Sequence, residues 1–494
     1  MYIQVQPKYQ NPQPKTKWQN FCGNFRWLKG IGLYVKNYFT ESCIHGFVYL
    51  VKEQLTLLEH LFWLLLLIVS VGMCIFTGLQ AIDKWKTKST VMGIQRDFYF
   101  WRLPVPSFTV CPMRRLSQEL FDKYCHKKKI TGQAKEDLQI FLETLANSTY
   151  FNFDNITARP SIDGTLDRLR VKPANYMSLI YNLTTDFTQM VDENEVIVLN
   201  DGFRNFVVRQ VLTEFGICYL CNSYLQDEYT ARYTIFGKYP KINKDHFKML
   251  LGSYFDSVLL ILSVPKAFES IGVFIHSPHD ALKIEQKFFY TNEAVYYKAE
   301  TFEIIAEEGY EKATTVAQRN CRYHHESNLE HFEIYTKSFC MQECRLNLVY
   351  KKCKCIPHFY PNRVRKPKPV CYYSTLKSCV AKNAESFRRL QSLKSRKTVH
   401  CHCMDSCYNG IVVIKNVEVL ANLNVFQTGF TVGLEVTTWP QVLYKRQVIF
   451  TMTDLLVAVG GAAGLFLGFS VLGAIEFFYY FTLRLICYLR GYRT

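Results

Sequence analysis

The chain has 494 residues, of which 49% are hydrophobic and 20% charged, and its net charge is +17 at pH 7. This length excludes one compact domain, so hydropathy has to show how the chain is divided. The basic surplus is spread along the chain, with short runs at 127–129 and 363–368, which favours solvated loops, with anionic lipid headgroups or sugars as the minor alternative. Nucleic acid is not an expected partner, because both runs lie in the part of the chain that is predicted below to be extracellular.

A first uncharged run, Leu61–Ile82, has the ~20 apolar residues that cross a lipid bilayer. It is too long for the hydrophobic region of a signal peptide and follows residues of mixed polarity, so we expect an uncleaved anchor. Leu455–Ile475 is a second such run. Buried helices of a soluble protein are the alternative. The sequence predicts a tail at 1–60, transmembrane helices at 61–82 and 454–481, a domain at 83–453 between them, and a short tail at 482–494.

Cysteines and glycosylation signals decide the orientation of the chain. The positive charges beside the runs predict conflicting orientations. Lys84, Lys86 and Lys88 follow the first run and would place the next segment in the cytoplasm, whereas Arg484, Arg490 and Arg493 after the second run favour a cytoplasmic C-terminus. Fourteen of the eighteen cysteines lie between the runs. Three Asn-x-Ser/Thr sequons also fall there, at Asn147, Asn155 and Asn182. We therefore expect an extracellular domain in the plasma membrane, both termini cytoplasmic, and reduced thiols at Cys22, Cys43, Cys74 and Cys487.

The extracellular domain is predicted to be α+β. Apolar residues alternate with polar ones from Val417 to Val425 and again from Val432 to Val436, which is the period of half-buried strands. The charge-rich stretches Arg114–Lys129 and Glu326–Tyr350 have apolar residues three or four apart, as helices do.

Ten cysteines are concentrated between Cys321 and Cys407. Their spacing is roughly mirror-symmetric, so nested disulfides are geometrically natural, but the spacing does not fix the pairing. Zinc held by Cys353, Cys355, Cys401 and Cys403 is the rival interpretation, which an oxidising compartment disfavours. The sequence has no HExxH motif, Walker loop or nucleophile elbow, so we expect neither an enzyme nor a bound metal or cofactor.

Glycines recur along the second run. Gly460, Gly464 and Gly468 share one helix face, which suits either close helix packing or a pore. Gly468-Phe469-Ser470 places bare backbone and a hydroxyl at membrane depth, where oxygen atoms could replace the hydration shell of sodium. Asp454 and Glu476 bracket the run and are either pore-mouth charges that concentrate cations or ordinary interfacial charges.

The segment Asp454–Phe481, DLLVAVGGAAGLFLGFSVLGAIEFFYYF, resembles the second membrane segment of the degenerin/epithelial sodium channel superfamily. Other marks of that family follow in order along the chain: His45-Gly46, FTVCP at 108–112, GxCYxxN at 216–222, GVFIHSP at 272–278 and QRNC at 318–321. The form of FTVCP and of CKCIPHFYP at 353–361 is similar to the insect pickpocket branch.

The resemblance implies an amiloride-sensitive sodium channel of sensory or epithelial cells. It implies two transmembrane helices, a disulfide-rich ectodomain and a homo- or heterotrimer in the bilayer, with sodium as the permeant ion. Gly468, Phe469 and Ser470 would form the selectivity filter, Gly464 would lie where amiloride binds, and His45 and Gly46 would be the gating motif. The implied disulfides are Cys111–Cys218, Cys321–Cys407, Cys340–Cys403, Cys344–Cys401, Cys353–Cys379 and Cys355–Cys371, which leaves Cys125 and Cys221 over.

One residue departs from the family pattern. Val457 stands where the family usually has a small side chain and where bulk favours the open state, so it either raises the resting open probability or repacks without effect.

Other classes remain to be weighed against a sodium channel. An ATP-gated channel would have a lysine four residues after a tyrosine beyond the second run, where Tyr480 is followed by Arg484 and Tyr488 by Tyr492. A non-conducting subunit or cell-surface receptor is the main alternative. The gating stimulus stays open.

Overall fold

The computed structural model describes residues 32–42, 44–96, 101–157, 159–184, 196–199, 208–225, 227–238, 250–252, 258–265, 271–284, 293–392, 397–421, 429–438 and 442–490. The chain forms two units, one made of Met1–Thr90 with Val448–Thr494 and the other of Val91–Gln447. The predicted thiols Cys22 and Cys43 lie outside the described residues.

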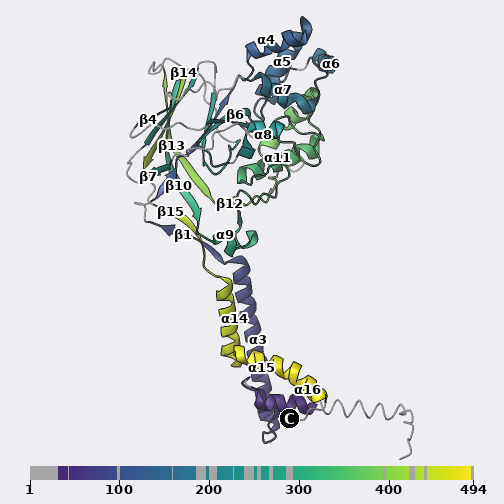
Figure 1. The fold of residues 1–494 in the computed structure, drawn as a ribbon, viewed down its shortest axis with the longest axis vertical. Helices are drawn as coiled ribbons and strands as arrows, with labels where there is room; N and C mark the ends of the chain where they lie inside the picture. The colour runs from purple at the N-terminus through teal and green to yellow at the C-terminus, as the bar shows by residue number, and fades with distance from the viewer. Residues whose placement is uncertain are drawn as a thin grey trace, which may run out of the picture. The chain divides into compact units, whose positions relative to one another are not determined.

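The first unit is helical. Its elements are a helix over residues 32–41, α2 (Phe47–Val51), α3 (Leu57–Thr87), α14 (Met452–Leu467), α15 (Val471–Tyr479), a π-helical turn (Tyr480–Arg484) and α16 (Leu485–Leu489). The long helix α3 packs alongside α14 (Figure 1).

Helix α3 extends beyond the predicted run at both ends. It begins after Thr56, whose backbone N–H donates to the Glu59 carboxylate in a capping box. Its 31 residues span about 46 Å at 1.5 Å per residue, more than the ~30 Å hydrocarbon core of a bilayer. None of its residues is buried within the chain. An apolar helix with that exposure is suited to lipid.

The second run is not one continuous helix: the transmembrane helix predicted at 454–481 is interrupted at Gly468–Ser470, where the sequence placed exposed backbone. Helix α14 ends at Leu467, residues 468–470 are not helical, and α15 begins at Val471. The cause is Gly468, whose φ of 65° lies in the left-handed region that a right-handed helix cannot continue through. By length and apolarity Leu57–Thr87 and Val471–Tyr488 could each cross a membrane, whereas Met452–Leu467 is shorter.

The second unit contains two main sheets. The seven-stranded sheet has the order β1-β15-β10-β14-β8-β4, with β13 also paired to β10, and the four-stranded sheet has the order β5-β6-β3-β9. Two smaller pairs are β2–β7 and β11–β12. The strand bounds are β1 Thr90–Gln95, β2 Arg102–Pro104, β3 Ser107–Pro112, β4 Val196–Leu199, β5 Val208–Thr213, β6 Gly216–Cys221, β7 Leu250–Gly252, β8 Val258–Pro265, β9 Ile271–His276, β10 Glu293–Ala306, β11 Cys321–Arg322, β12 Asp405–Ser406, β13 Asn409–Ala421, β14 Gly429–Thr438 and β15 Leu443–Val448.

The two main sheets bury one apolar layer between them. Phe108 and Tyr219 of the four-stranded sheet belong to the same buried cluster as Val295, Tyr297 and Leu434 of the larger sheet. The alternation predicted from Val432 to Val436 fits this arrangement, because the side chains of Val432, Leu434 and Val436 on β14 are buried. Strand β13 also confirms the predicted strand as far as Ala421, and the residues beyond it are not described.

Helices cover the other end of this unit, around a core of their own (Figure 1). Their bounds are α4 Gln118–Lys128, α5 Gln133–Asn147, α6 Pro160–Arg168, α7 Tyr176–Leu183, α8 Ala231–Phe236, α11 Lys337–Cys353, α12 Tyr373–Thr375 and α13 Ala384–Arg388. Two short helices lie apart from this core: α9 (Tyr310–Ala313), which Figure 1 draws near β15, and α10 (Val316–Arg319), which precedes β11. The prediction of a helix from Glu326 is wrong for residues 326–336. The Thr336 side chain accepts the Phe339 N–H at 3.1 Å and so starts α11 there.

Six disulfides tie this unit together. They join Cys111 to Cys218, Cys321 to Cys407, Cys340 to Cys403, Cys344 to Cys401, Cys353 to Cys379 and Cys355 to Cys371, which are the pairs that the resemblance implies. Four of these cysteines, at positions 353, 355, 401 and 403, were the candidate zinc ligands, and the bonds leave them no thiolates to offer.

Cys125 and Cys221 are both free and buried. Burial raises the pKa of the Cys221 thiol to about 12, so it stays protonated. Of the sequon residues, Asn155 and Asn182 are exposed, as a glycan acceptor must be, whereas Asn147 is partly buried at the end of α5.

Glu303 is a buried carboxyl on β10, and burial raises its pKa to about 8 from an ordinary 4.5. A raised pKa means that the protonated side chain stabilises the fold below about pH 4.5 and that this contribution is lost as pH rises through about 8. We expect Glu303→Gln to flatten the fall in melting temperature between pH 5 and pH 8 by several degrees. Thermal unfolding of both proteins at the two pH values checks this, and identical pH profiles would contradict it.

Candidate functional site

The break in the second apolar run has a defined geometry. The Gly468 N–H donates to the Gly464 carbonyl at 2.9 Å, and the Phe469 N–H donates to the Ala463 carbonyl at 3.2 Å. Ser470 then starts α15, because its Oγ accepts the Gly473 N–H at 3.1 Å. The carbonyl end of α14, which carries a partial negative charge, therefore meets the break.

His45 packs directly against this break. Its backbone N–H donates to the Leu467 carbonyl, the last of α14, at 3.2 Å. A Cβ on Gly468 would lie 2.7 Å from the His45 ring carbon Cδ2, so only glycine fits beside this ring. The structure thus brings together two predicted features, the His45-Gly46 motif and the Gly468–Ser470 triplet, which lie at opposite ends of the chain.

Gly46 allows the chain to turn into this position. Its φ is 98°, in the region that glycine alone adopts easily, and it precedes α2. A Cβ there would also approach Leu67 of α3 to 3.1 Å. The segment before the first membrane helix is therefore seated between α3 and the end of α14.

The glycine face of α14 is open within the chain. Among the described residues, a Cβ on Gly460 or Gly461 would meet nothing within 4 Å, and one on Gly464 would meet only the Phe469 carbonyl at 3.8 Å. Val457 has 73% of its surface exposed. This face is therefore free to contact other subunits, water or a small molecule.

The two acidic residues that bracket the run have different surroundings. Asp454 caps the start of α14, where its carboxylate accepts the Thr451 N–H at 2.7 Å. Glu476 is half-buried within α15, beyond the break. About 20 Å of helix, at 1.5 Å per residue, separates Asp454 from the break, and Glu476 lies beyond the break. The carboxylates of Asp454 and Glu476 therefore do not form one ring of charge.

An aromatic cluster, which the sequence analysis missed, holds the end of the second run. Tyr34 and Tyr38, on the helix at 32–41, each place their rings 4.8 Å from the ring of Tyr480. The Tyr34 hydroxyl donates to the Tyr480 carbonyl at 2.5 Å, an oxygen that also accepts the π-type bond from Leu485. The sequence Phe477–Phe481, FFYYF, carried the signal for such a cluster.

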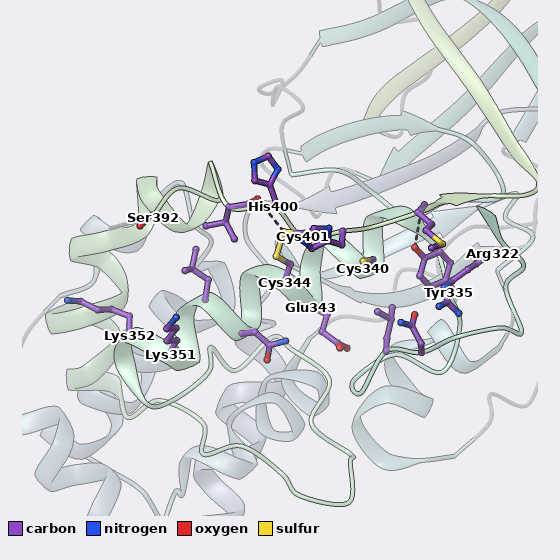
Figure 2. A pocket seen from close by; sticks show the side chains of 17 residues that line it. Arg322, Tyr335, Cys340, Glu343, Cys344, Lys351, Lys352, Ser392, His400 and Cys401 are labelled. Carbon is purple, nitrogen blue, oxygen red and sulfur yellow. Dashed lines mark hydrogen bonds between the residues drawn. A yellow bond between two sulfur atoms is a disulfide. The ribbon is translucent and has the colours of Figure 1, made fainter. Parts of the chain in front are cut away.

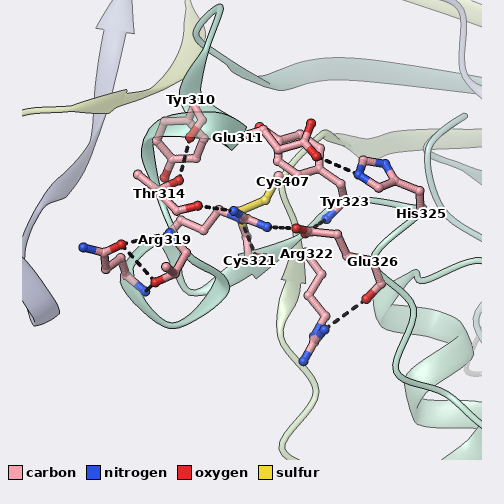
Figure 3. Close-up of polar contacts among 12 residues, drawn as sticks. Tyr310, Glu311, Thr314, Arg319, Cys321, Arg322, Tyr323, His325, Glu326 and Cys407 are labelled. Carbon is pink, nitrogen blue, oxygen red and sulfur yellow. Dashed lines mark hydrogen bonds and ion pairs between the residues drawn. A yellow bond between two sulfur atoms is a disulfide. The ribbon is translucent and has the colours of Figure 1, made fainter. Parts of the chain in front are cut away.

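Metal-ligating side chains come together once among the described residues, near the Cys321–Cys407 disulfide (Figure 3). Ligand atoms of Glu311, His325 and Glu326 lie within 4.8 Å of one another. Glu326 already accepts from the Arg319 guanidinium and from the Tyr323 N–H, and His325 Nε2 lies 2.7 Å from Glu311. Ion pairs and hydrogen bonds account for this cluster without a metal.

Comparison with known proteins gives matches over most of the chain. The family model for the amiloride-sensitive sodium channel matches residues 38–480. Pickpocket protein 28 of Drosophila melanogaster is 21% identical over 541 residues, which cover 96% of this chain and 81% of that protein. Sodium channel protein Nach of the same species is 22% identical over 495 residues, covering 90% and 86%. Nach of Drosophila ananassae is 21% identical over 502 residues, covering 95% and 87%.

Proposed function

Since the chain belongs to the amiloride-sensitive sodium channel family, which is a family of ion channels and not of enzymes, and is a channel subunit, we propose that it conducts sodium selectively across the plasma membrane. Three subunits, identical or related, surround one pore, and both termini of each are cytoplasmic. The observation that carries this proposal is the break at Gly468–Ser470, where His45 packs against the carbonyl end of a helix.

The break supplies groups suited to sodium. Backbone can leave a helix at membrane depth only where it lines a cavity or is buried in protein. Carbonyl oxygens at the end of α14, with the backbone of Gly468, Phe469 and Ser470, can replace water around a hard cation. Ser470 Oγ also caps α15, which fixes the position of this hydroxyl. His45 and Gly46 hold the break from the cytoplasmic side, so their movement would change the filter.

The open glycine face also suits a blocker. Amiloride is a flat cation, and the absence of side chains at Gly460, Gly461 and Gly464 leaves room for it beside α14 in the proposed pore. We therefore propose amiloride sensitivity with Gly464 in the binding site, in channels of sensory or epithelial cells.

Whole-cell recording with ion substitution tests the proposed conduction. The chain is expressed alone and with related subunits, and external sodium is exchanged for potassium and then for an impermeant organic cation. We expect an inward sodium current that amiloride blocks and that external potassium does not carry equally well. Surface-expressed protein that passes no current in any combination would favour a non-conducting subunit or receptor.

Val457 offers a test of the resting state. If its bulk favours the open pore, Val457→Ala should reduce the resting sodium current about threefold, a shift of under 1 kcal/mol between closed and open states. The current is compared at equal surface abundance, with Val459→Ala on the same helix as the matched control. Equal resting currents in wild type and Val457→Ala would show that the side chain repacks without effect.

A further inference from the structure

A groove of about 940 Å³ runs along one face of α11 (Figure 2). The opposite face of this helix is buried and includes Phe339, Leu346 and Val349. The residues of α11 that line the groove are alternately three positions and one position apart in the sequence, so they form one continuous stripe on the helix surface. They are Cys340, Glu343, Cys344, Asn347, Leu348, Lys351 and Lys352.

The far wall of the groove is fixed in place. It is formed by the segment Val399–Met404, which two disulfides, Cys340–Cys403 and Cys344–Cys401, bind to the helix. The Tyr335 hydroxyl donates to the Met404 carbonyl at 2.8 Å and closes one end. A groove held by covalent bonds needs little ordering when a ligand enters, which favours binding.

The groove is basic at both ends. Arg322, stacked 5.6 Å from the Tyr335 ring centre, lies at one end, and Lys351 and Lys352 lie at the other (Figure 2). Among the described residues neither lysine has an ion-pair partner within 4.0 Å. Glu343 is the acidic residue of the lining, and its carboxylate already accepts the N–H groups of Glu330 and His331 at 3.0 and 2.8 Å.

The rest of the lining combines apolar and polar side chains. Leu329, Leu348, Val399 and Met404 form its apolar part, together with the disulfide sulfurs, and the polar part is formed by Asn328, Asn347, Ser392, His400 and His402. A uniformly charged polysaccharide would leave the apolar groups without a matching surface. A peptide can match both parts, because acidic side chains can meet the ends and an apolar side chain the middle.

We propose that this groove binds an extended acidic peptide segment. From Cys340 to Lys352 the helix rises about 18 Å at 1.5 Å per residue. An extended peptide advances about 3.3 Å per residue, so five or six residues fill the groove. The inference concerns binding and does not depend on whether the channel conducts.

Fluorescence anisotropy of the full-length protein in detergent micelles tests the proposal. The probe is a fluorescein-labelled amidated hexapeptide, Glu-Glu-Leu-Glu-Glu-Glu, in 150 mM salt. We expect the double variant Lys351→Glu/Lys352→Glu to bind at least tenfold more weakly than wild type. The matched control is Lys127→Glu/Lys128→Glu, which reverses two exposed lysines in the last turn of α4 and makes the same change in net charge. This control should bind within twofold of wild type.

A further variant, a changed probe and a competing sugar extend this test. Asn347→Glu puts one negative charge at an exposed position in the middle of the stripe and should also weaken binding tenfold, and melting temperatures confirm that each variant is folded. Replacing leucine by serine in the probe should weaken binding severalfold. Equal losses in the α11 and α4 variants would overturn the proposal in favour of unspecific attraction. A heparin hexasaccharide that displaces the peptide at equal concentration would overturn it in favour of a sugar site.

Discussion

Replacing Gly468 by alanine should reduce the sodium current at least tenfold at equal surface abundance. A left-handed φ costs a residue with a Cβ about 1–2 kcal/mol. The new Cβ would also lie 2.7 Å from the His45 ring, so either this ring or the carbonyl end of α14 must move. The two effects act on the residues that we propose to contact the ion. Whole-cell recording with surface biotinylation measures the change.

Two further variants identify the cause of the loss. Gly78→Ala is the matched control on α3, where a Cβ meets no described residue within 4 Å, and it should leave the current unchanged. Adding His45→Ala to Gly468→Ala removes the close contact but keeps the backbone strain, so a partial recovery would assign the loss to the His45 contact. A wild-type current in Gly468→Ala would contradict the proposed role of the break.

Hydropathy predicted the two apolar runs but could not show that the second one breaks. Apolarity depends on side chains, and an unbroken helix and a helix pair with a left-handed glycine between them have the same composition. The first run is a single helix because α3 has no such residue, and only its ends were misplaced. The helix α3 extends past the apolar run Leu61–Ile82, from Thr56 as its N-cap to Thr87 as its last residue. Capping and charge, and not hydropathy, determine where a helix ends.

The contact between His45 and Gly468 could not be derived from residue patterns. It joins positions at opposite ends of the sequence, and a single histidine in a loop has no periodicity that would reveal its partner. The disulfide pairing was open for a similar reason, because the spacing of ten cysteines allows many ladders. For the His45–Gly468 contact and for the disulfides alike, the family resemblance indicated the residues involved, and the structure shows which of them are in contact.

Removing Arg345 alone should destabilise the second unit by about 3–5 kcal/mol, the usual cost of leaving a buried charge without its partner. Arg345 Nη1 lies 2.6 and 2.5 Å from the two carboxylate oxygens of Glu214, and both side chains are about 95% buried. The Tyr360 hydroxyl donates to the same carboxylate at 2.5 Å. Arg345→Met keeps the bulk of the side chain and strands the Glu214 charge. The melting temperature of the full-length protein in detergent should fall by several degrees.

The double variant Glu214→Leu/Arg345→Met separates charge from packing. If the loss comes from the stranded carboxylate, the double variant should recover most of the stability, because a buried ion pair replaced by apolar groups is often neutral or better. The exposed pair Lys337–Asp405 is the control, with side chains 48% and 52% exposed, and Lys337→Met should change stability by less than about 1 kcal/mol. A double variant as unstable as Arg345→Met would instead assign the loss to the hydrogen bonds that the guanidinium gives to the Phe387 carbonyl and Glu214. In that case Arg345 would stabilise the fold mainly through the geometry of its fork and not by neutralising a buried charge.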